Sequence, residues 1–124
     1  MIRNNNNKKN HWQSSFPITE DIQNNFYGFV YVITNMISNR KYIGCKKFNK
    51  HWQSYTGSNT ELNKDIETFG SSRFEFKILN IYKTKSELRL AEAQEILISN
   101  ALTSKKYYNQ YIQLRLRINN NNKI

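Results

Sequence analysis

The apolar positions of this chain follow two spacings, which predict strands in some segments and helices in others. Runs of β-branched and aromatic residues predict strands at Gly28–Ile33, Arg40–Cys45 and Phe74–Leu79. Turn-forming residues bound the segment Asn35–Asn39, so the first two strands are expected to form an antiparallel hairpin. In residues 112–118 apolar and polar positions alternate, which is typical of a further, half-exposed strand.

A first helix is predicted over Thr60–Gly70. A capping box formed by Ser58 and Glu61 marks its beginning, and Gly70 is the natural end. Its apolar face is expected to hold Leu62, Ile66 and Phe69.

A second, longer helix is predicted over Ser86–Ala101, after a capping box at Thr84 and Glu87. Glu92 and Glu95 are expected near the edge opposite its apolar side. That apolar side is expected to hold Leu90, Leu97, Ile98, Ala101 and Leu102.

The order of these elements predicts a small α+β domain over residues 28–118, with a three-stranded antiparallel sheet flanked by helices. A polar leader, residues 1–27, precedes it and includes the low-complexity run Asn4–Asn7. An Asn-rich tail, residues 119–124, follows it. Three apolar residues of the leader are expected to attach part of it to the domain: Trp12, Phe16 and Ile18.

The net charge of the chain restricts the classes of function that it can have. The chain has 19 Lys and Arg against 9 Asp and Glu, a net charge of +10. A small domain with this balance is typical of nucleic-acid binding. We find neither a membrane span, nor a secretory start, nor a strongly amphipathic basic helix, so we expect a cytoplasmic protein without membrane contact. One cysteine, Cys45, excludes an internal disulfide, and with two histidines it argues against a zinc site.

Residues with AT-rich codons, such as Asn, Lys, Ile, Tyr and Phe, dominate the composition. This bias indicates an AT-rich genome, such as that of a phage or another mobile element. It also means that many Asn residues carry little functional information.

The hairpin carries two tripeptides, Phe29-Val30-Tyr31 and, ten residues later, Tyr42-Ile43-Gly44. The pair resembles the motifs Gly-Ile-Tyr and Tyr-Ile-Gly that GIY-YIG endonucleases carry on two paired strands. The resemblance extends over residues 28–109, with features in the family's order. These are the polar turn at Asn35, the middle helix, the third strand, a helical segment with Glu92 and a closing Tyr108-Asn109.

The sequence departs from that pattern twice. Phe29 stands where the first motif has its glycine, and Gly28 precedes it. The family also places a catalytic arginine shortly after Tyr-Ile-Gly, whereas this chain has no arginine between Arg40 and Arg73. That stretch instead offers the cations Lys46, Lys47, Lys50 and His51.

The resemblance implies a role for each matching residue. Glu92 would hold a single Mg²⁺, or Mn²⁺ in its place, which activates water and acts as a Lewis acid. Tyr31 would be the general base, because nearby positive charge favours its phenolate. Tyr42 would hydrogen-bond the phosphate or the water, and Asn109 would support the site. Lys46 or Lys47 would neutralise charge in the transition state.

Strand parity separates the two lysines. Alternate residues of a strand share a face, so Lys46 is expected on the side of Tyr42 and Gly44 if the strand stays regular. A bulge would instead bring Lys47 to that side. Further candidate contacts to DNA are Lys50, His51, Arg73, Arg115 and Arg117.

Other interpretations stay open. The two tyrosines could be plain strand residues, and Glu92 could be an exposed carboxylate with Glu95 as its rival. Arg115 and Arg117 could be solvated charges at a strand edge. Asp65, Glu75 and Lys77 loosely fit another metal-nuclease pattern, Asp…Glu-x-Lys.

These observations together predict a Mg²⁺-dependent DNA endonuclease from a phage or mobile element, for example a homing endonuclease. Its partner would be DNA, with a second copy of the chain or a separate specificity protein in addition. The alternative is a non-catalytic, basic nucleic-acid-binding module on the same fold.

Overall fold

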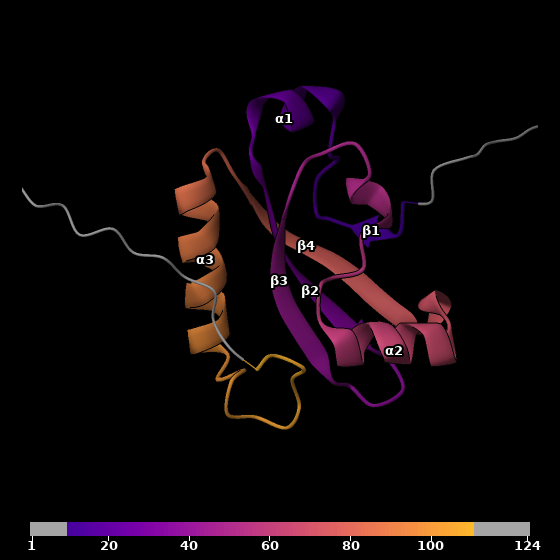
Figure 1. Cartoon of the computed structure of the whole chain (residues 1–124). Coiled ribbons are helices and arrows are strands. Elements are labelled where there is room, and N and C mark those ends of the chain that lie inside the picture. The colour runs from indigo at the N-terminus through magenta and orange to yellow at the C-terminus, as the bar shows by residue number, and fades with distance from the viewer. Residues whose placement is uncertain (1–9, 111–124) are drawn as a thin grey trace, which may run out of the picture.

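The computed structural model describes residues 10–110 (Figure 1). One mixed sheet has the strand order β1-β4-β2-β3. Its strands are β1 (Trp12–Gln13), β2 (Gly28–Asn35), β3 (Lys41–Lys47) and β4 (Phe74–Tyr82). The helices are α1 (Glu20–Asn25), α2 (Thr60–Phe69) and α3 (Lys85–Ile98), with short 3₁₀ turns at Trp52–Ser54 and Ser71–Arg73. The α+β class predicted from sequence is confirmed.

The predicted hairpin and third strand form the centre of this sheet. Strand β2 pairs antiparallel with both β3 and β4. The register with β4 shifts between Val30 and Tyr31, where β4 contains one extra residue, Leu79. Such a bulge lengthens one strand locally, and β4 extends to Tyr82, beyond the predicted end at Leu79.

The predicted three-stranded antiparallel sheet was wrong in one respect. The leader adds a fourth strand, β1, which pairs parallel with β4, Trp12 opposite Phe76. A two-residue strand has no detectable alternation, so the sequence pattern could not show it. Burial of Trp12 provides the physical reason for the pairing, because its indole stacks edge-on against Phe29 and Phe76.

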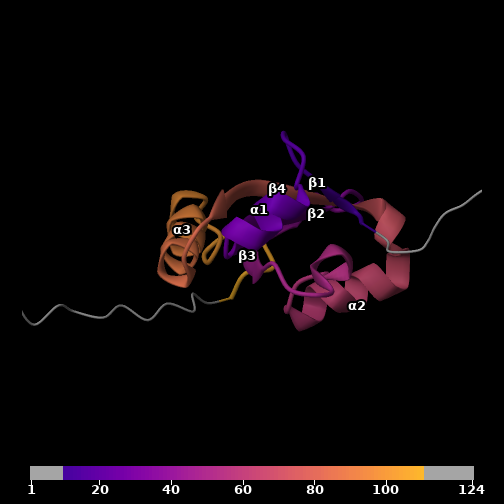
Figure 2. The same cartoon turned by 90° about the horizontal axis from the view of Figure 1, so that it is seen from above.

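Two hydrophobic cores lie on the two faces of the sheet. One face carries Phe29, Tyr31 and Ile33 of β2, packed with Leu62 of α2 and Trp52. The other face carries Val30 and Ile43, packed with Leu88 and Ile96 of α3. Figures 1 and 2 show α2 and α3 apart, on either side of the hairpin. Strand β3 is the edge strand on the side of α3 and α2, and residues of the segment after α3 pair with its outer side at Lys41 and Ile43.

The helix ends largely follow the sequence signals. Thr84 caps α3 by accepting a hydrogen bond from Glu87 N, as predicted. Gly70 ends α2 with a positive φ of 90°, which favours glycine. The N-cap of α2 is Asn59 rather than Ser58, since the Asn59 side chain accepts from Leu62 N at 2.8 Å. Helix α3 ends at Ile98, three residues before the predicted end.

The predicted buried face of α3 was wrong at four of its five positions. Leu90 is 45% exposed, Leu97 61%, Ile98 77% and Leu102 37%, whereas Ala101, which follows α3, is buried as expected. The buried residues of α3 are Leu88, Ala93 and Ile96. The sheet therefore packs against a face with less apolar bulk, where small alanines allow a close approach. The expected apolar face of α2 is correct at Leu62, but Phe69 is 45% exposed.

Parts of the leader belong to this fold. Trp12 is buried and donates from its indole Nε1 to the Trp52 carbonyl. Ile18 packs against the same core, so the attachment predicted for the leader is confirmed at Trp12 and Ile18. Phe16 lines a surface groove beside Trp12 and Trp52. Thr19 caps α1.

Several sequence predictions fall outside the described residues: the strand at 112–118, Arg115, Arg117, the run Asn4–Asn7 and the tail 119–124. Within residues 10–110, none of the helices is both long and apolar enough to cross a membrane.

Candidate active site

A cavity of about 260 Å³ opens along the outer edge of β3. Four residues predicted for the site line it together: Tyr31, Tyr42, Glu92 and Asn109. They come from β2, β3, α3 and the segment after α3, so the fold gathers residues that are up to 78 positions apart. The sequence-based grouping of these four residues therefore agrees with the geometry.

Tyr31 reaches the cavity because of the register between β2 and β3. It pairs directly with Gly44, and its ring extends beneath that glycine. A Cβ at position 44 would collide with the Tyr31 hydroxyl. Tyr31 is only 1% exposed, so its ring is part of the core while its hydroxyl end borders the cavity.

Three tyrosines form one wall of the cavity. The Tyr31 ring centroid lies 6.2 Å from that of Tyr42 and 6.1 Å from that of Tyr55. The Tyr42 hydroxyl lies 3.4 Å from Ser58 Oγ. Burial, then the neighbouring Tyr55 and Tyr42, raise the pKa of Tyr31 well above its usual value. A phenolate at Tyr31 therefore requires positive charge close to its oxygen.

Glu92 lies on the opposite wall, on the face of α3 that packs against the sheet. It is four residues from Leu88 and four from Ile96, and both are buried. Burial raises the pKa of the Glu92 carboxyl, while a hydrogen bond with the Cys45 thiol and the charge of Arg89 act in the lowering direction. Burial raises the pKa of Cys45 to about 12, so the thiol is protonated and donates to the carboxylate.

Asn109 holds the segment that follows α3 against strand β3. Its side-chain oxygen accepts from Ile43 N at 3.0 Å, and its side-chain nitrogen donates to Ile43 O at 2.8 Å. Asn109 is 7% exposed, so both bonds are buried. The supporting position expected for Asn109 is consistent with this pairing.

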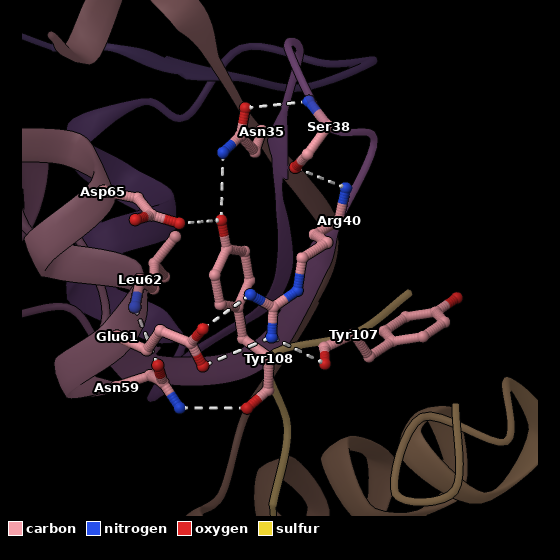
Figure 3. A network of polar contacts seen from close by, with 9 residues as sticks. All are labelled: Asn35, Ser38, Arg40, Asn59, Glu61, Leu62, Asp65, Tyr107 and Tyr108. Carbon is pink, nitrogen blue, oxygen red and sulfur yellow. Dashed lines mark hydrogen bonds and ion pairs between the residues drawn. The ribbon is translucent and has the colours of Figure 1, made fainter. Parts of the chain in front are cut away.

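A polar network anchors the same segment (Figure 3). The Tyr108 hydroxyl donates to Asp65 Oδ2 at 2.8 Å and accepts from Asn35 Nδ2 at 3.0 Å. The Arg40 guanidinium lies 4.1 Å above the Tyr108 ring and pairs with Glu61. The network connects the end of β2, the start of α2 and the residue next to Asn109. It thereby fixes where Asn109 meets β3.

The two candidate lysines differ as strand parity predicts. The pairing stays regular to the end of β3, with Lys46 opposite Phe29, so Lys46 shares the face of Tyr42. Neither lysine lines the main cavity. Both border an adjoining groove of about 240 Å³, where Lys46 Nζ lies 4.5 Å from the Tyr55 ring centroid. Lys47 is exposed on the other face.

Three further candidates lie away from the cavity. Lys50, His51 and Arg73 are exposed and do not line it. Arg73 follows α2, and its carbonyl accepts from Met36 N at the tip of the hairpin. The geometry leaves these three as surface groups that DNA could contact.

Among the cavity residues that sequence reasoning did not assign to the site are Arg89 and Tyr55. Arg89 lies three residues before Glu92, the spacing that brings two side chains to one helix face. That spacing is visible in the sequence. Because the wrong face of α3 was predicted to be buried, Arg89 was not recognised as a neighbour of the site. No pattern indicated Tyr55, since it follows an irregular segment.

Two rival assignments of the metal site lose their geometric basis. Asp65 lies on α2, which packs on the face of Phe74 and Phe76, whereas Glu75 and Lys77 alternate with those residues on β4. The Asp…Glu-x-Lys residues therefore do not converge. Glu95 does not line the cavity, and its carboxylate lies 3.5 Å from Ser99 Oγ.

Comparisons with known proteins agree with this arrangement. Residues 12–112 match the family described as "Putative endonuclease segE, GIY-YIG domain". The match begins at β1, so it includes the part of the leader that joins the sheet. No solved structure is significantly similar to the chain.

Three curated relatives come from Enterobacteria phage T4. The putative endonuclease segE is 36% identical over 83 residues, which cover 67% of this chain and 40% of that protein. The endonuclease segA is 33% identical over 72 residues, 58% of this chain and 33% of that protein. The putative endonuclease segC is 30% identical over 88 residues, 71% of this chain and 44% of that protein.

The chain thus spans between 33% and 44% of the length of these three relatives. The family match covers far more than half of the chain and includes all four predicted cavity residues. The chain belongs to the GIY-YIG endonuclease family.

Proposed function

We propose that this domain hydrolyses phosphodiester bonds of DNA in the cavity beside β3, with one Mg²⁺ held by Glu92. One observation carries the proposal: the fold brings Tyr31, Tyr42, Glu92 and Asn109 into one cavity although they come from four separate segments. Family membership and the net charge of +10 support it further.

The residues fit a magnesium ion. Mg²⁺ binds through one or two carboxylates and retains several waters, and Glu92 provides one carboxylate at a cavity that accommodates water molecules. Among the described residues no three His, Cys, Asp or Glu side chains cluster as a metal cage. The donor set is therefore that of a sparsely ligated, hydrated ion. When bound, Mg²⁺ would supply Lewis-acid stabilisation and a more acidic water.

In the proposed reaction a water oxygen attacks phosphorus as the bond to the leaving oxygen breaks. Tyr31, directly or through an intervening water, takes the proton of the attacking water, and the leaving oxygen gains a proton from solvent. Tyr42, at the rim, hydrogen-bonds the phosphate or the water. Asn109 holds β3, and with it Tyr42, in place through its two bonds to Ile43.

DNA would follow the groove that adjoins the cavity. Lys46 and Lys47 border that groove and would bind phosphates flanking the cleaved one. Lys50, His51 and Arg73 would add surface contacts. Such contacts position DNA without reading its sequence, so specificity would come from a second copy or another protein. With phage proteins as relatives, we propose a phage or mobile-element nuclease, such as a homing endonuclease, that acts in the host cytoplasm.

The test compares Glu92→Gln with Glu95→Gln, which removes the same charge one turn along α3 but outside the cavity. Both variants and the wild type are incubated with supercoiled plasmid and phage genomic DNA in Mg²⁺. We expect the wild type and Glu95→Gln to cleave, and Glu92→Gln to bind DNA within a few-fold but not to cleave it.

Two results would contradict the proposal. Cleavage by Glu92→Gln in Mg²⁺ would remove Glu92 from the metal site. DNA binding by the wild type without any metal-dependent cleavage would favour the non-catalytic, basic binding module.

A further inference from the structure

The cavity contains one basic side chain from the described part of the chain, that of Arg89. The lysines that follow the Tyr-Ile-Gly motif lie elsewhere. Lys46 packs its ammonium over Tyr55 in the adjoining groove, and Lys47 and Lys50 are exposed. Within the described residues, neither the end of β3 nor the segment after it therefore brings a cation into the cavity of the two tyrosines.

We propose that the Arg89 guanidinium, presented by α3 one turn before Glu92, provides the positive charge that stabilises the transition state in this cavity. The inference rests on the proposed function, because it assigns a catalytic residue to the same site. It places the cation on the helix that carries the metal-binding carboxylate, rather than on the segment after β3.

The position of Arg89 supports this role. It is half-buried, and it lines both the cavity and the adjoining groove, so its side chain lies where the two meet. A phosphate that enters from the groove toward Glu92 would pass Arg89. The three-residue spacing directs both side chains to the same side of the helix.

The charge of Arg89 lies close to the proposed metal ligand, because Arg89 and Glu92 line the same cavity from positions three residues apart on α3. Within residues 10–110 the ion pair formed is Arg40 with Glu61, so Arg89 is not held by a carboxylate there. Its guanidinium can therefore turn toward an incoming phosphate.

The chemistry of the guanidinium fits the task. Arginine presents parallel N–H donors that match two phosphate oxygens, and it stays protonated at neutral pH. Negative charge grows on these oxygens as the water attacks, so a fixed cation stabilises the transition state more than the bound substrate.

The experiment measures single-turnover cleavage at saturating protein and Mg²⁺, with Lys85→Ala as the matched control. Lys85 is an exposed cation on α3, one turn before Arg89 and outside both cavities. We expect Arg89→Ala to slow cleavage by about 10²–10³-fold, the loss typical of one preorganised transition-state donor. Lys85→Ala should cleave at nearly the wild-type rate, and Arg89→Lys should fall between the two.

Two readouts separate a catalytic charge from a structural or positioning role. Added guanidinium ion should raise the rate of Arg89→Ala but not that of Glu92→Gln. The Mg²⁺ concentration for half-maximal rate should stay the same or fall in Arg89→Ala, because a positive charge next to Glu92 is removed. If Arg89→Ala fails to fold, Arg89→Gln, which nearly keeps the side-chain length, carries the same measurements.

Each contrary result overturns a defined statement. A wild-type rate for Arg89→Ala, or a loss restored by excess Mg²⁺, would overturn the role of Arg89 and leave the proposed function intact. A rate loss in Arg89→Ala that neither the Arg89→Lys substitution nor added guanidinium ion restores would overturn that role as well. Absence of metal-dependent cleavage by the wild type would overturn the proposed function, and this inference with it.

Discussion

The Tyr31 hydroxyl lies in the space that Gly44 leaves open on the neighbouring strand. The two residues are direct partners in the β2–β3 pairing, and a Cβ on Gly44 would overlap the Tyr31 ring end. The last residue of Tyr-Ile-Gly therefore has a steric function. It allows a tyrosine from the central strand to pass under the edge strand and reach the cavity.

Gly44→Ala should therefore displace Tyr31 and impair cleavage more than binding. Overpacking of this kind costs about 1–3 kcal/mol of unfolding free energy. Urea unfolding of Gly44→Ala, Tyr31→Ala and the double variant checks the cause. The alanine at position 44 should cost less in the Tyr31→Ala background, because both the hydroxyl and the ring carbon Cζ that would collide with its Cβ are absent. Additive costs would show that the two residues do not compete for space.

Tyr31→Phe and Tyr42→Phe should fold and lose activity. Each removes one hydroxyl, and the stability cost is about 1 kcal/mol where that hydroxyl is hydrogen-bonded. Single-turnover cleavage should fall about 10²-fold or more where the hydroxyl takes part in proton transfer. Tyr82→Phe is the control, since Tyr82 packs against the other face of the sheet. Near wild-type rates for both site variants would mean that the tyrosines are structural.

The sequence predicted the hairpin, both main helices and the third strand because each has a strong local signal. The run of β-branched and aromatic residues at β2, the Thr84 cap and the Gly70 stop all depend on residues close together in the chain. The parallel strand at Trp12 depends on a partner 64 residues away, Phe76, and two residues carry no period. Long-range pairing of this kind is decided by packing, which a local pattern does not record.

The candidate site likewise contains residues that the sequence could indicate and residues that only packing reveals. The four predicted residues came from a family resemblance, and the structure places them together. Arg89 was missed because Leu90, Leu97 and Ile98 made the wrong face of α3 look buried. A face chosen by apolar bulk put Glu92 near the solvent edge. Its actual position is half-buried, between the buried residues Leu88 and Ile96, and a carboxylate there needs a function or a partner.

Lys46→Ala and Lys47→Ala should both weaken DNA binding without slowing cleavage at saturating protein. Both lysines border the groove rather than the cavity, and contacts to phosphates are screened by salt. The affinity of each variant, measured at two salt concentrations, should show a smaller salt dependence than that of the wild type. A large loss in the single-turnover rate of Lys46→Ala would assign the transition-state cation to Lys46 instead of Arg89.

Asn109→Ala should destabilise the protein and loosen the site together. The change leaves the buried N–H and C=O groups of Ile43 without partners, and each unsatisfied group costs about 1–3 kcal/mol. Thermal unfolding is the measurement, and Gln110→Ala, next to it but exposed, is the stability control. Equal unfolding midpoints for the two variants would show that the Asn109 pairing contributes little.

Trp12→Ala should be among the most destabilising substitutions in the chain, although residue 12 precedes both motif strands. Truncation of a buried tryptophan costs about 3–5 kcal/mol. Urea unfolding should show this loss, while Gln13→Ala in the same strand, which is exposed, should unfold like the wild type. A small effect of Trp12→Ala would show that β1 is dispensable for the core.

The Asn109 amide also bears on how this protein stays separate from its neighbours. An exposed edge strand is a template on which another chain can add a strand, and it is a common origin of aggregation. Asn109 presents to Ile43 the same donor and acceptor that an incoming strand would offer. A single side chain thus occupies the place of a β-partner at the mouth of the cavity. The site can remain open to a long polymer substrate while the strand that builds it is closed at Ile43 to the addition of another strand.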